Sequence, residues 1–446
     1  MISVNLYKRL FNKFPALFAK VISALIPNFG KLKKYKNILA VPYSTYFQQQ
    51  KIKSNPIRIL IAPTSVCNYR CLFCEIHKDN LLYPNRSQNV VDLNVIKNYE
   101  SFLSSSYKLS FSGGTEEPLL NKDFGKIVQY LKQKYGTKMM VNTNASMLNR
   151  DLADNLIKFG FDLILVSYHA GSKEKYKELM TGNIDIVDEN LRYLKIQKKQ
   201  NGKNKPVVNF NFALHKLNAA EYEFIFEKAK SLGASQVIIN KYYGGRNRLQ
   251  DKKVSFDYDI KEGNQVLDKI YVCAEKGGIQ LRPPMPQYWT KEKVKWNPEY
   301  FDASIKCTLP WTNLNFKPVV GEKNCHYVSV CNRINLFKIA YDKIQLKTQK
   351  QLDVLWNHPA LQYLRKTVNS KEMINPICKY CKNYDTATIR NTDAQQYAEI
   401  RDKAMRDFFA EFREQCSFEE IDGLEVLTEN PDPDEKFQKK LKELEN

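Results

Sequence analysis

The octapeptide Cys67-Asn68-Tyr69-Arg70-Cys71-Leu72-Phe73-Cys74 is the most informative stretch of the chain. It closely follows the apolar run Ile59-Leu60-Ile61-Ala62, which places it on a loop after a predicted strand. Its C-x3-C-x2-C spacing lets three thiolates bind three irons of a cubic iron–sulfur cluster and leave the fourth iron open to a small molecule. A zinc loop completed by Glu75 or His77 is one alternative, and three unrelated buried cysteines are another.

Two later segments favour a ligand site beside this loop. Ser112-Gly113-Gly114-Thr115-Glu116-Glu117-Pro118 follows the strand-like run Leu109-Ser110-Phe111. Paired glycines let a backbone approach a ligand closely and adopt positive φ angles, although a plain turn after a strand is the alternative. The third segment, Met139-Met140-Val141-Asn142-Thr143-Asn144, again places polar residues at the end of an apolar run.

Together these segments resemble the signature of the radical S-adenosylmethionine (radical SAM) enzymes, with Phe73 as the aromatic residue of the cysteine motif. The resemblance implies a [4Fe-4S] cluster whose open iron binds SAM and cleaves it reductively to methionine and a 5′-deoxyadenosyl radical. Because Thr115 and Glu116 separate the glycines from Glu117, the choice of the glutamate that faces SAM stays open. The implied residues are Cys67, Cys71 and Cys74 as catalytic cluster ligands, and Phe73, Gly113, Gly114, Glu117, Asn142 and Ser167 as SAM contacts.

From about residue 56 the sequence alternates short strand patterns with longer helical patterns, which predicts a parallel sheet. The fold class is therefore α/β, and the resemblance implies a partial (β/α)6 parallel barrel over residues 56–285. The predicted strands are Ile57–Ala62, Tyr107–Phe111, Lys138–Asn142, Asp162–Ser167, Val207–Ala213 and Gln236–Lys241. The predicted helices are Val91–Ser104, Asp123–Tyr135, Asp151–Phe159, Ile184–Lys199 and Ala219–Leu232, the last ending at Gly233.

Ligands of parallel barrels bind at the carboxyl ends of the strands. This rule adds several polar residues to the candidates, and each of them could equally belong to a capping turn or a hydrogen-bonded loop. They are Asn144 after the third predicted strand, Tyr168 and His169 after the fourth, His215 after the fifth, and Asn240 and Tyr242 at the sixth.

A second cysteine set lies in residues 286–385, where Cys307 and Cys325 flank a predicted hairpin and Cys378-x2-Cys381 follows. By spacing alone, four such cysteines suit zinc as well as a cluster. The arrangement resembles the SPASM and twitch domains of the same family. Since only Cys416 follows the pair, the one-cluster twitch form fits better and implies one auxiliary [4Fe-4S] cluster. Cys331 and Cys273 are left over, with Cys331 either a hydrogen-atom donor or a structural thiol.

The net charge of +21 is uneven, because no Asp or Glu precedes Glu75. Residues 1–55 are predicted to form a basic amphipathic extension, broken by Pro15 and Pro27. It could cap its own domain, contact an anionic membrane surface through residues 1–36, or bind an acidic partner or leader peptide. Nucleic acid is the least favoured partner, since no recognised nucleic-acid module accompanies the charge.

The chain of 446 residues is long enough for more than one domain and a core without disulfides. Its ten cysteines cluster as metal ligands do, which favours a reducing cytoplasm. No secretory signal or membrane-spanning run is evident in the sequence. Residues 386–446 are predicted as a helix, Asp393–Cys416 with Asp393 as its N-cap, and a flexible or loosely docked acidic tail.

The predicted function is abstraction of a hydrogen atom from an unactivated carbon of a sugar-like, cyclitol or lipid-linked small molecule. The cofactors supply this chemistry and the protein supplies position and electrostatics. A reductant such as flavodoxin or ferredoxin is the expected partner. Two other functions remain open from the sequence: a maturase that modifies a ribosomally made peptide, and a zinc-stapled binding protein that is not an enzyme.

Overall fold

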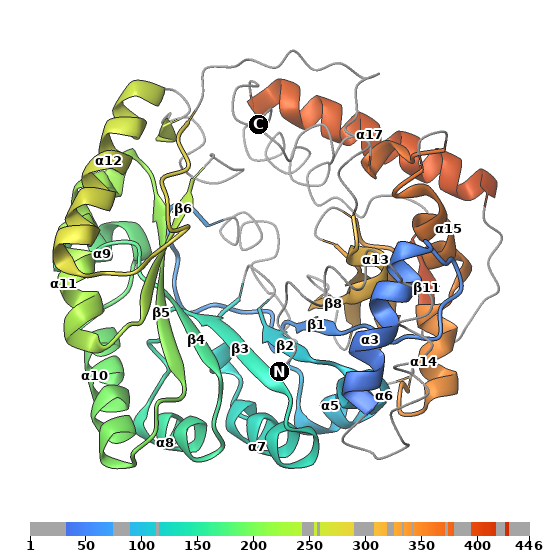
Figure 1. The fold of residues 1–446 in the computed structure, drawn as a ribbon, viewed down its shortest axis with the longest axis horizontal. Helices are drawn as coiled ribbons and strands as arrows, with labels where there is room; N and C mark the ends of the chain where they lie inside the picture. The colour runs from blue at the N-terminus through green and yellow to red at the C-terminus, as the bar shows by residue number, and fades with distance from the viewer. Residues whose placement is uncertain are drawn as a thin grey trace, which may run out of the picture.

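The computed structural model describes residues 33–74, 90–112, 116–242, 254–256, 259–289, 307–318, 325–331, 334–340, 343, 345–370, 373–378, 394–415 and 424–427. These residues build one eleven-stranded sheet in the order β11-β10-β9-β8-β1-β2-β3-β4-β5-β6-β7. The strands from β8 through β1 to β7 pair in parallel, whereas β8, β9, β10 and β11 pair antiparallel. Figure 1 shows this open sheet curving inside a ring of helices.

All six predicted strands of the barrel form, which confirms the α/β partial barrel. They are β1 (Arg58–Ile61), β2 (Lys108–Phe111), β3 (Lys138–Thr143), β4 (Leu163–Ser167), β5 (Val207–Leu214) and β6 (Gln236–Lys241). The sequence prediction missed β7 (Leu281–Arg282) and the parallel pairing of β8 (Asn313–Pro318) with β1. The remaining strands are β9 (Cys325–Ser329), β10 (Phe337–Ala340) and β11 (Leu424–Val426).

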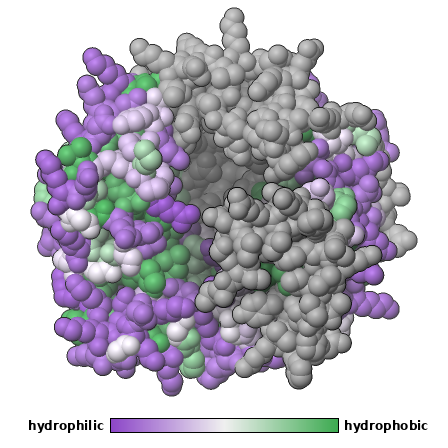
Figure 2. Space-filling model, viewed as in Figure 1, coloured by the Kyte–Doolittle hydropathy of each residue, from purple (hydrophilic) through white to green (hydrophobic). Residues whose placement is uncertain are grey.

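The helices beside the barrel strands cover the outer face of the sheet. They are α5 (Leu93–Asn98), α6 (Glu100–Ser105), α7 (Phe124–Tyr135), α8 (Arg150–Lys158), α9 (Lys173–Met180), α10 (Ile184–Gln200), α11 (Tyr222–Leu232) and α12 (Ile260–Gly277). Helix α11 ends at Gly233, whose φ of 76° is the left-handed conformation expected of a helix C-terminus. On the left of Figure 2 the outer rim of α10–α12 is mostly hydrophilic, as suits helices with one solvent-facing side.

Two helix predictions need correction, and two helices were missed. The helix predicted over Val91–Ser104 is two helices, because Tyr99 leaves helical geometry between α5 and α6 while its ring is fully buried. Residues 219–221 belong to the 3-10 turn η3 (Lys216–Glu221) that precedes α11. Helices α9 and α12 were not predicted. Helix α12 ends at the left-handed Gly278, a stop signal that is visible in the sequence, whereas α9 ends at the left-handed Thr181, directly before Gly182.

Alternation along the strands separates two faces of the sheet. Ile59 and Ile61 of β1, and Leu109 and Phe111 of β2, are almost fully buried against the helices. Burial of each such side chain contributes about 1.5–3 kcal/mol. The residues between them, such as Leu60 and Ser110, point to the inner face and are only half-buried. The inner face is therefore free to take polar residues, and it leads to the carboxyl ends of the strands.

The C-terminal elements continue the sheet and its helical cover. They comprise α13 (Leu309–Thr312), α14 (Gln349–Trp356), α15 (Pro359–Thr367) and α17 (Ala394–Gln415). The tail after Phe418 is predicted to be flexible or loosely docked. Its described residues, 424–427, are docked, because β11 pairs with β10 and Leu424 and Leu427 are buried. Within the described residues, no helix combines the length and apolar character needed to span a bilayer.

The described part of the N-terminal extension packs on its own chain. Helix α3 (Lys33–Tyr46) contacts α6 and α13, and Val41 is 2% exposed. Asn37 bonds Asn55 in both directions, with Nδ2 donating to the carbonyl oxygen and Oδ1 accepting from the amide, at 2.9 and 2.6 Å. Residues 1–32, which carry half of the Lys and Arg residues of the predicted basic extension, lie outside the described residues.

A stretch without regular structure, residues 48–55, is bound by side chains of the C-terminal helices. Trp311 Nε1 donates to Gln49 O at 2.9 Å, and Trp356 Nε1 donates to Ser54 O at 2.9 Å. Asn357 holds both the amide and the carbonyl of Ile52, at 2.8 and 2.9 Å. These side chains satisfy backbone groups that a strand or helix would otherwise satisfy, and they fix the approach to β1.

Candidate active site

The cysteine loop, residues 67–74, leaves the carboxyl end of the barrel and is tied to the end of helix α9. The amide of Arg70 donates to Thr181 Oγ1 at 2.7 Å, and the amide of Leu72 donates to Leu179 O at 2.9 Å. Cys71 Sγ lies 3.5 Å from the carbonyl oxygen of Met180. The loop is thus held by a neighbouring element as well as by its own strand.

Tyr69 fixes the cysteine loop by packing its ring into the protein interior. Its ring is buried at 6% exposure and meets Tyr176 edge-on at 6.4 Å. Gly182 lies directly against this ring, because a Cβ at that position would fall 2.1 Å from Tyr69 Cζ. Sequence reasoning missed Thr181 and Gly182 as supports of the site, although a small residue after a helical pattern was a visible signal.

The three thiols of the loop lie within electrostatic reach of one another. Burial raises the pKa of Cys67 to about 12, with further contributions from Glu117 and Cys74. Burial also raises the pKa of Cys71 well above its usual range, and Cys74 and Cys67 add to the effect. Without metal the thiols of Cys67 and Cys71 are therefore protonated at neutral pH, and iron binding must displace their protons.

This donor set fits an iron–sulfur cluster. Each thiolate of such a cluster bonds a separate iron, so the sulfurs need not converge on one point. Among the described residues, no three His, Cys, Asp or Glu side chains are placed around a single metal ion. Glu75 and His77, the alternative zinc ligands, lie outside the described residues, as do Gly113 and Gly114.

Glu117, in the second loop of the site, has a buried carboxylate that stabilises the loop through hydrogen bonds. Its carboxylate is 1% exposed, and Oε1 accepts from the Leu119 amide at 3.0 Å and from Thr143 Oγ1 at 2.5 Å. Oε2 accepts from the amide of Asn144 at 2.7 Å. The Glu117 amide itself donates to Val66 O at 2.9 Å, which joins this loop to the cysteine loop. Its role as a SAM contact stays a prediction, and Glu116 remains the alternative.

Burial of Glu117 has a measurable consequence for the pH dependence of stability. Burial raises its pKa from 4.5 to about 7, against the effect of the three donors. Between pH 4.5 and 7 the folded protein keeps a proton that the unfolded chain has lost. We therefore expect its contribution to the free energy of unfolding, about 3 kcal/mol, to be present below pH 4.5 and lost as the pH rises to 7.

The substitution Glu117→Gln removes this titration. Urea unfolding at pH 4.5 and 7.5 measures the difference between the free energies of unfolding of wild type and variant. That difference should shrink by about 3 kcal/mol from the lower to the higher pH. Glu178→Gln, at an exposed glutamate on α9, is the matched control and should show a constant difference. A constant difference for Glu117→Gln would contradict the predicted pKa.

Phe73 meets two buried histidines at the carboxyl ends of β4 and β5. Its ring centroid lies 4.8 Å from that of His169 and 5.6 Å from that of His215. Burial lowers the pKa of His169 to about 3 and that of His215 to about 4, so both rings are neutral at pH 7. His169 Nδ1 accepts from the Ala213 amide at 3.0 Å, which puts its proton on Nε2. The structure therefore brings His169 and His215 to the cysteine loop.

The other predicted polar residues lie at the same end of the sheet. Asn142 Nδ2 donates to Ser112 Oγ at 3.3 Å, while its Oδ1 is a buried acceptor without a partner among the described residues. Ser167 is half-buried on the inner face of β4, and Asn240 bonds Asn211 across β6 and β5. Asn144 bonds Asn68 of the cysteine loop at 3.0 Å. An unpaired acceptor at Asn142 suits a bound cofactor.

Three of the four predicted auxiliary ligands fall within the described residues. Cys307 exchanges two hydrogen bonds with Asn369, both at 2.9 Å, and the amide of Cys378 donates to Asn375 Oδ1 at 2.9 Å. Asn375 in turn bonds Thr367 at 2.7 Å, two residues before Asn369, so Cys307 and Cys378 are both held near the end of α15. Cys325 begins β9 and Cys381 lies outside the described residues. The auxiliary cluster stays a prediction.

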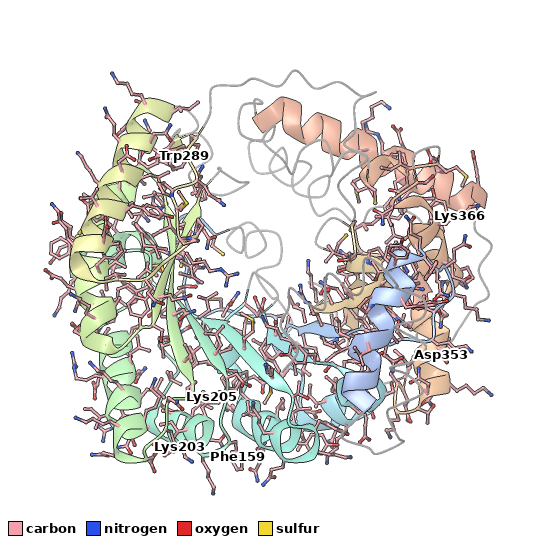
Figure 3. The ribbon with its side chains drawn as sticks, in the orientation of Figure 1. Phe159, Lys203, Lys205, Trp289, Asp353 and Lys366 are labelled. Carbon is pink, nitrogen blue, oxygen red and sulfur yellow. The ribbon has the colours of Figure 1, made fainter. Side chains whose placement is uncertain are left out.

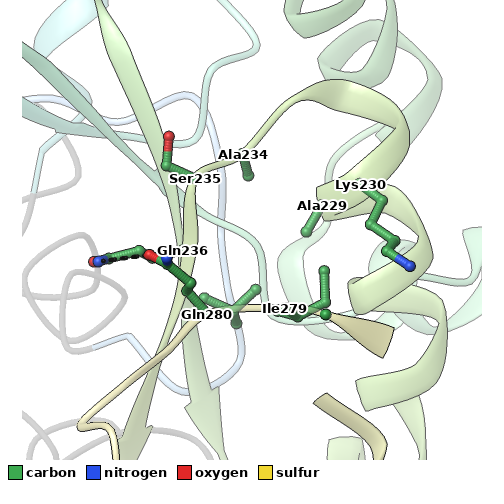
Figure 4. Close-up of a pocket in the computed structure, with 9 residues that line it drawn as sticks. Ala229, Lys230, Ala234, Ser235, Gln236, Ile279 and Gln280 are labelled. Carbon is green, nitrogen blue, oxygen red and sulfur yellow. Dashed lines mark hydrogen bonds between the residues drawn. The ribbon is translucent and has the colours of Figure 1, made fainter. Parts of the chain in front are cut away.

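A pocket of about 390 Å³ lies at the opposite, amino end of the sheet. It is formed where α11 and α12 end, and Figure 4 shows Ala229 and Lys230 on one side and Gln236 and Gln280 on the other. Figure 3 locates this end of the strands by Lys203 and Lys205. None of the predicted site residues lines the pocket, so it is separate from the cysteine loop.

Comparisons with known proteins agree with this geometry. The family model described as the Radical SAM superfamily matches residues 61–229. The chain is 31% identical over 227 residues to a probable GTP 3′,8-cyclase of Saccharolobus islandicus (strain L.S.2.15 / Lassen #1), covering 50% of this chain and 68% of that protein. It is 30% identical over 241 residues to a protein of the same name from Saccharolobus solfataricus, covering 53% and 73%.

Among solved structures, the chain resembles Streptococcus suis SuiB bound to precursor peptide SuiA. The TM-score is 0.52 at 16% sequence identity, and the match covers 85% of this chain and 84% of that one. At this identity the likeness concerns the fold alone. It extends beyond the six βα repeats into the C-terminal elements, since it covers most of both chains.

Proposed function

The chain belongs to the radical SAM superfamily, and on that premise we propose that it removes a hydrogen atom from an unactivated carbon of a small molecule. The proposed substrate is sugar-like, a cyclitol or lipid-linked. The observation that carries the proposal is the cysteine loop at the carboxyl end of the barrel. Its three thiols lie near one another, and Thr181 at the end of α9 holds the loop. The chain is an enzyme of this superfamily, so a non-enzymatic zinc protein is no longer an alternative.

In this proposal Cys67, Cys71 and Cys74 hold the [4Fe-4S] cluster, and Cys307, Cys325, Cys378 and Cys381 hold one auxiliary [4Fe-4S] cluster. Phe73, Gly113, Gly114, Glu117, Asn142 and Ser167 would hold SAM. The first cluster would supply an electron, and SAM would supply the radical that takes hydrogen from carbon. The auxiliary cluster, filled by four protein ligands, suits electron transfer. Ferredoxin or flavodoxin would supply electrons.

The residues of the chain itself position and shield this chemistry. The neutral His169 and His215 add no charge beside Phe73, and they keep water away from its ring because both are buried. Tyr69 and Thr181 hold the cysteine loop in place. Glu117 fixes the glycine loop to β3 through Thr143 and Asn144. The protein thus contributes orientation and a dry site.

The relatives favour a small molecule as substrate. The proteins of about 30% identity are named for a cyclase that acts on GTP, a small molecule. A peptide maturase is the second candidate, because the fold resembles that of SuiB, which was solved with a precursor peptide. Cytoplasmic location, the division at residues 55, 285 and 385, and membrane contact through residues 1–36 remain proposals. In the described part, α3 contacts its own chain.

The test is SAM cleavage by protein purified without oxygen. We expect about eight irons per chain and slow formation of 5′-deoxyadenosine under reduction. A low-mass metabolite fraction should accelerate this formation, and protease treatment of the fraction should not remove the effect. Acceleration that protease abolishes would point to the maturase instead. A protein that holds no iron and cleaves no SAM would overturn the proposal.

A further inference from the structure

The inner face of the eight parallel strands carries no acidic residue within the described strands. Strand alternation places its side chains away from the helices, where they face one another across the curved sheet. Its polar side chains are either amides and hydroxyls or cations. The inner positions are Arg58, Leu60, Lys108, Ser110, Lys138, Met140, Asn142, Leu163, Leu165, Ser167, Val207, Asn209, Asn211, Ala213, Gln236, Ile238, Asn240, Arg282, Asn313, Asn315 and Lys317.

Three cationic residues are aligned on neighbouring strands at the amino end of this face. Arg58 on β1 is aligned with Lys108 on β2, and Lys108 is aligned with Lys138 on β3. Lys138 donates to the hydroxyl of Tyr107 at 2.5 Å and lies over its ring, so it is partly engaged. Arg58 is exposed and Lys108 is half-buried, and neither forms an ion pair with a carboxylate of the described residues.

A fourth cation reaches the same place from the far edge of the sheet. Arg282 lies on β7, six strands from β1. Lys108 is half-buried, and its pKa is lowered first by burial and then by Arg58 and Arg282. The influence of Arg282 on Lys108 agrees with the curvature of the open sheet in Figure 1. Arg282 also forms no ion pair among the described carboxylates, so it is a third unpaired cation beside Arg58 and Lys108.

Amide side chains lie between this cation cluster and the cysteine loop. Asn142 and Asn209 flank Leu165 in the register of β3, β4 and β5. Asn209 is 7% exposed, and its Oδ1 has no partner among the described residues. Asn313 pairs with Arg58, and Lys317 lies four residues further along β8. Lys317 is therefore about 13 Å beyond Asn313 along the strands. This distance suits a small polar molecule with an anionic end.

We propose that the substrate is a phosphorylated polyol, with its phosphate on Arg58, Lys108 and Arg282 and its hydroxyl groups on the inner amides. The assignment rests on the proposed function and narrows its substrate class. Like charges held together destabilise the protein unless an anion neutralises them, and a phosphate is bound well by several charged donors. Amides supply both donors and acceptors for hydroxyl groups. The phosphate could belong to a soluble sugar phosphate or to a lipid-linked one.

An acidic peptide would also be attracted to cations, but the inner face favours the polyol. The amide side chains of this face project from the strands and not from the loops, and apolar side chains such as Leu163 and Leu165 lie between them. The cation cluster lies at the amino end of the strands, where Arg58 and Arg282 are exposed, and away from the loops at which a peptide would enter a barrel of this kind. The peptide is therefore an outcome of the test and not a part of the proposal.

The test measures anion binding by the cluster-loaded protein without reductant or SAM. Calorimetry with ribose 5-phosphate, ribose, inorganic phosphate and a polyprenyl phosphate in detergent separates the contributions of phosphate, hydroxyls and lipid. We expect ribose 5-phosphate or the polyprenyl phosphate to bind at least about ten-fold tighter than inorganic phosphate or ribose. The variant Arg58→Gln/Lys108→Gln/Arg282→Gln should weaken this binding by at least about ten-fold.

The matched control is Lys203→Gln/Lys269→Gln/Lys366→Gln, three exposed lysines away from the inner face with the same change of net charge. It should keep wild-type binding, and circular dichroism should show that both variants are folded. Equal losses in both variants, no binding of any phosphate, or tighter binding of a polyglutamate peptide would overturn the proposal. Because no SAM is cleaved in this experiment, its result is independent of the test of the proposed function.

Discussion

The variant Cys67→Ala/Cys71→Ala/Cys74→Ala should lose SAM cleavage, with formation of 5′-deoxyadenosine reduced at least about a thousand-fold. It should also retain only about four of about eight irons, because the proposed auxiliary cluster has separate ligands. The physical reason is the donor set: one thiolate per iron holds the cluster, and alanine offers no ligand. Product analysis and iron determination on anaerobically purified protein measure both effects.

Cys273→Ala is the control for this experiment. Cys273 lies half-buried on α12, and burial raises its pKa, as expected of an unreactive structural thiol. Its loss should leave iron content and SAM cleavage unchanged. Retention of SAM cleavage by the triple variant would contradict the assignment of the loop. Loss of all iron would instead show that the second cysteine set holds no cluster of its own.

Replacing Arg365 by methionine should lower the free energy of unfolding by about 3–6 kcal/mol. Arg365 is fully buried, lies over the Trp356 ring at 4.6 Å, and donates to three backbone carbonyls. They belong to Pro310 at 3.0 Å, Gln50 at 3.0 Å and Trp356 at 2.8 Å. Burial lowers its pKa to about 9, so the guanidinium is still charged at pH 7 and keeps all its donors.

Methionine keeps much of the apolar volume of arginine but leaves these three carbonyls without a donor. Urea denaturation measures the loss of stability. Limited proteolysis should show faster cleavage in residues 48–55, because the Gln50 carbonyl is released. Lys366→Met changes the exposed neighbour shown in Figure 3 and should have almost no effect. A loss below 1 kcal/mol for Arg365→Met would mean that water replaces the guanidinium without difficulty.

The sequence indicated the barrel well because the signals are local. Apart from β2, each of β1 to β6 is a short run with β-branched residues, and the six strands alternate with helical patterns. The cysteine spacing likewise lies within eight residues, so it predicts a cluster loop without knowledge of the fold. The predicted His169 and His215 follow from one rule about strand ends, and both lie beside Phe73 in the structure.

By itself, then, the sequence determined the α/β class, the six core strands and the loop of three cysteines, because the residues that specify them are neighbours along the chain. Only the tertiary structure decided the pairing of β8 with β1, the hydrogen bond from Arg365 to Gln50 and the alignment of Arg58 with Lys108. These contacts join residues up to 315 positions apart. They depend on the register and curvature of the whole sheet, which no local pattern encodes.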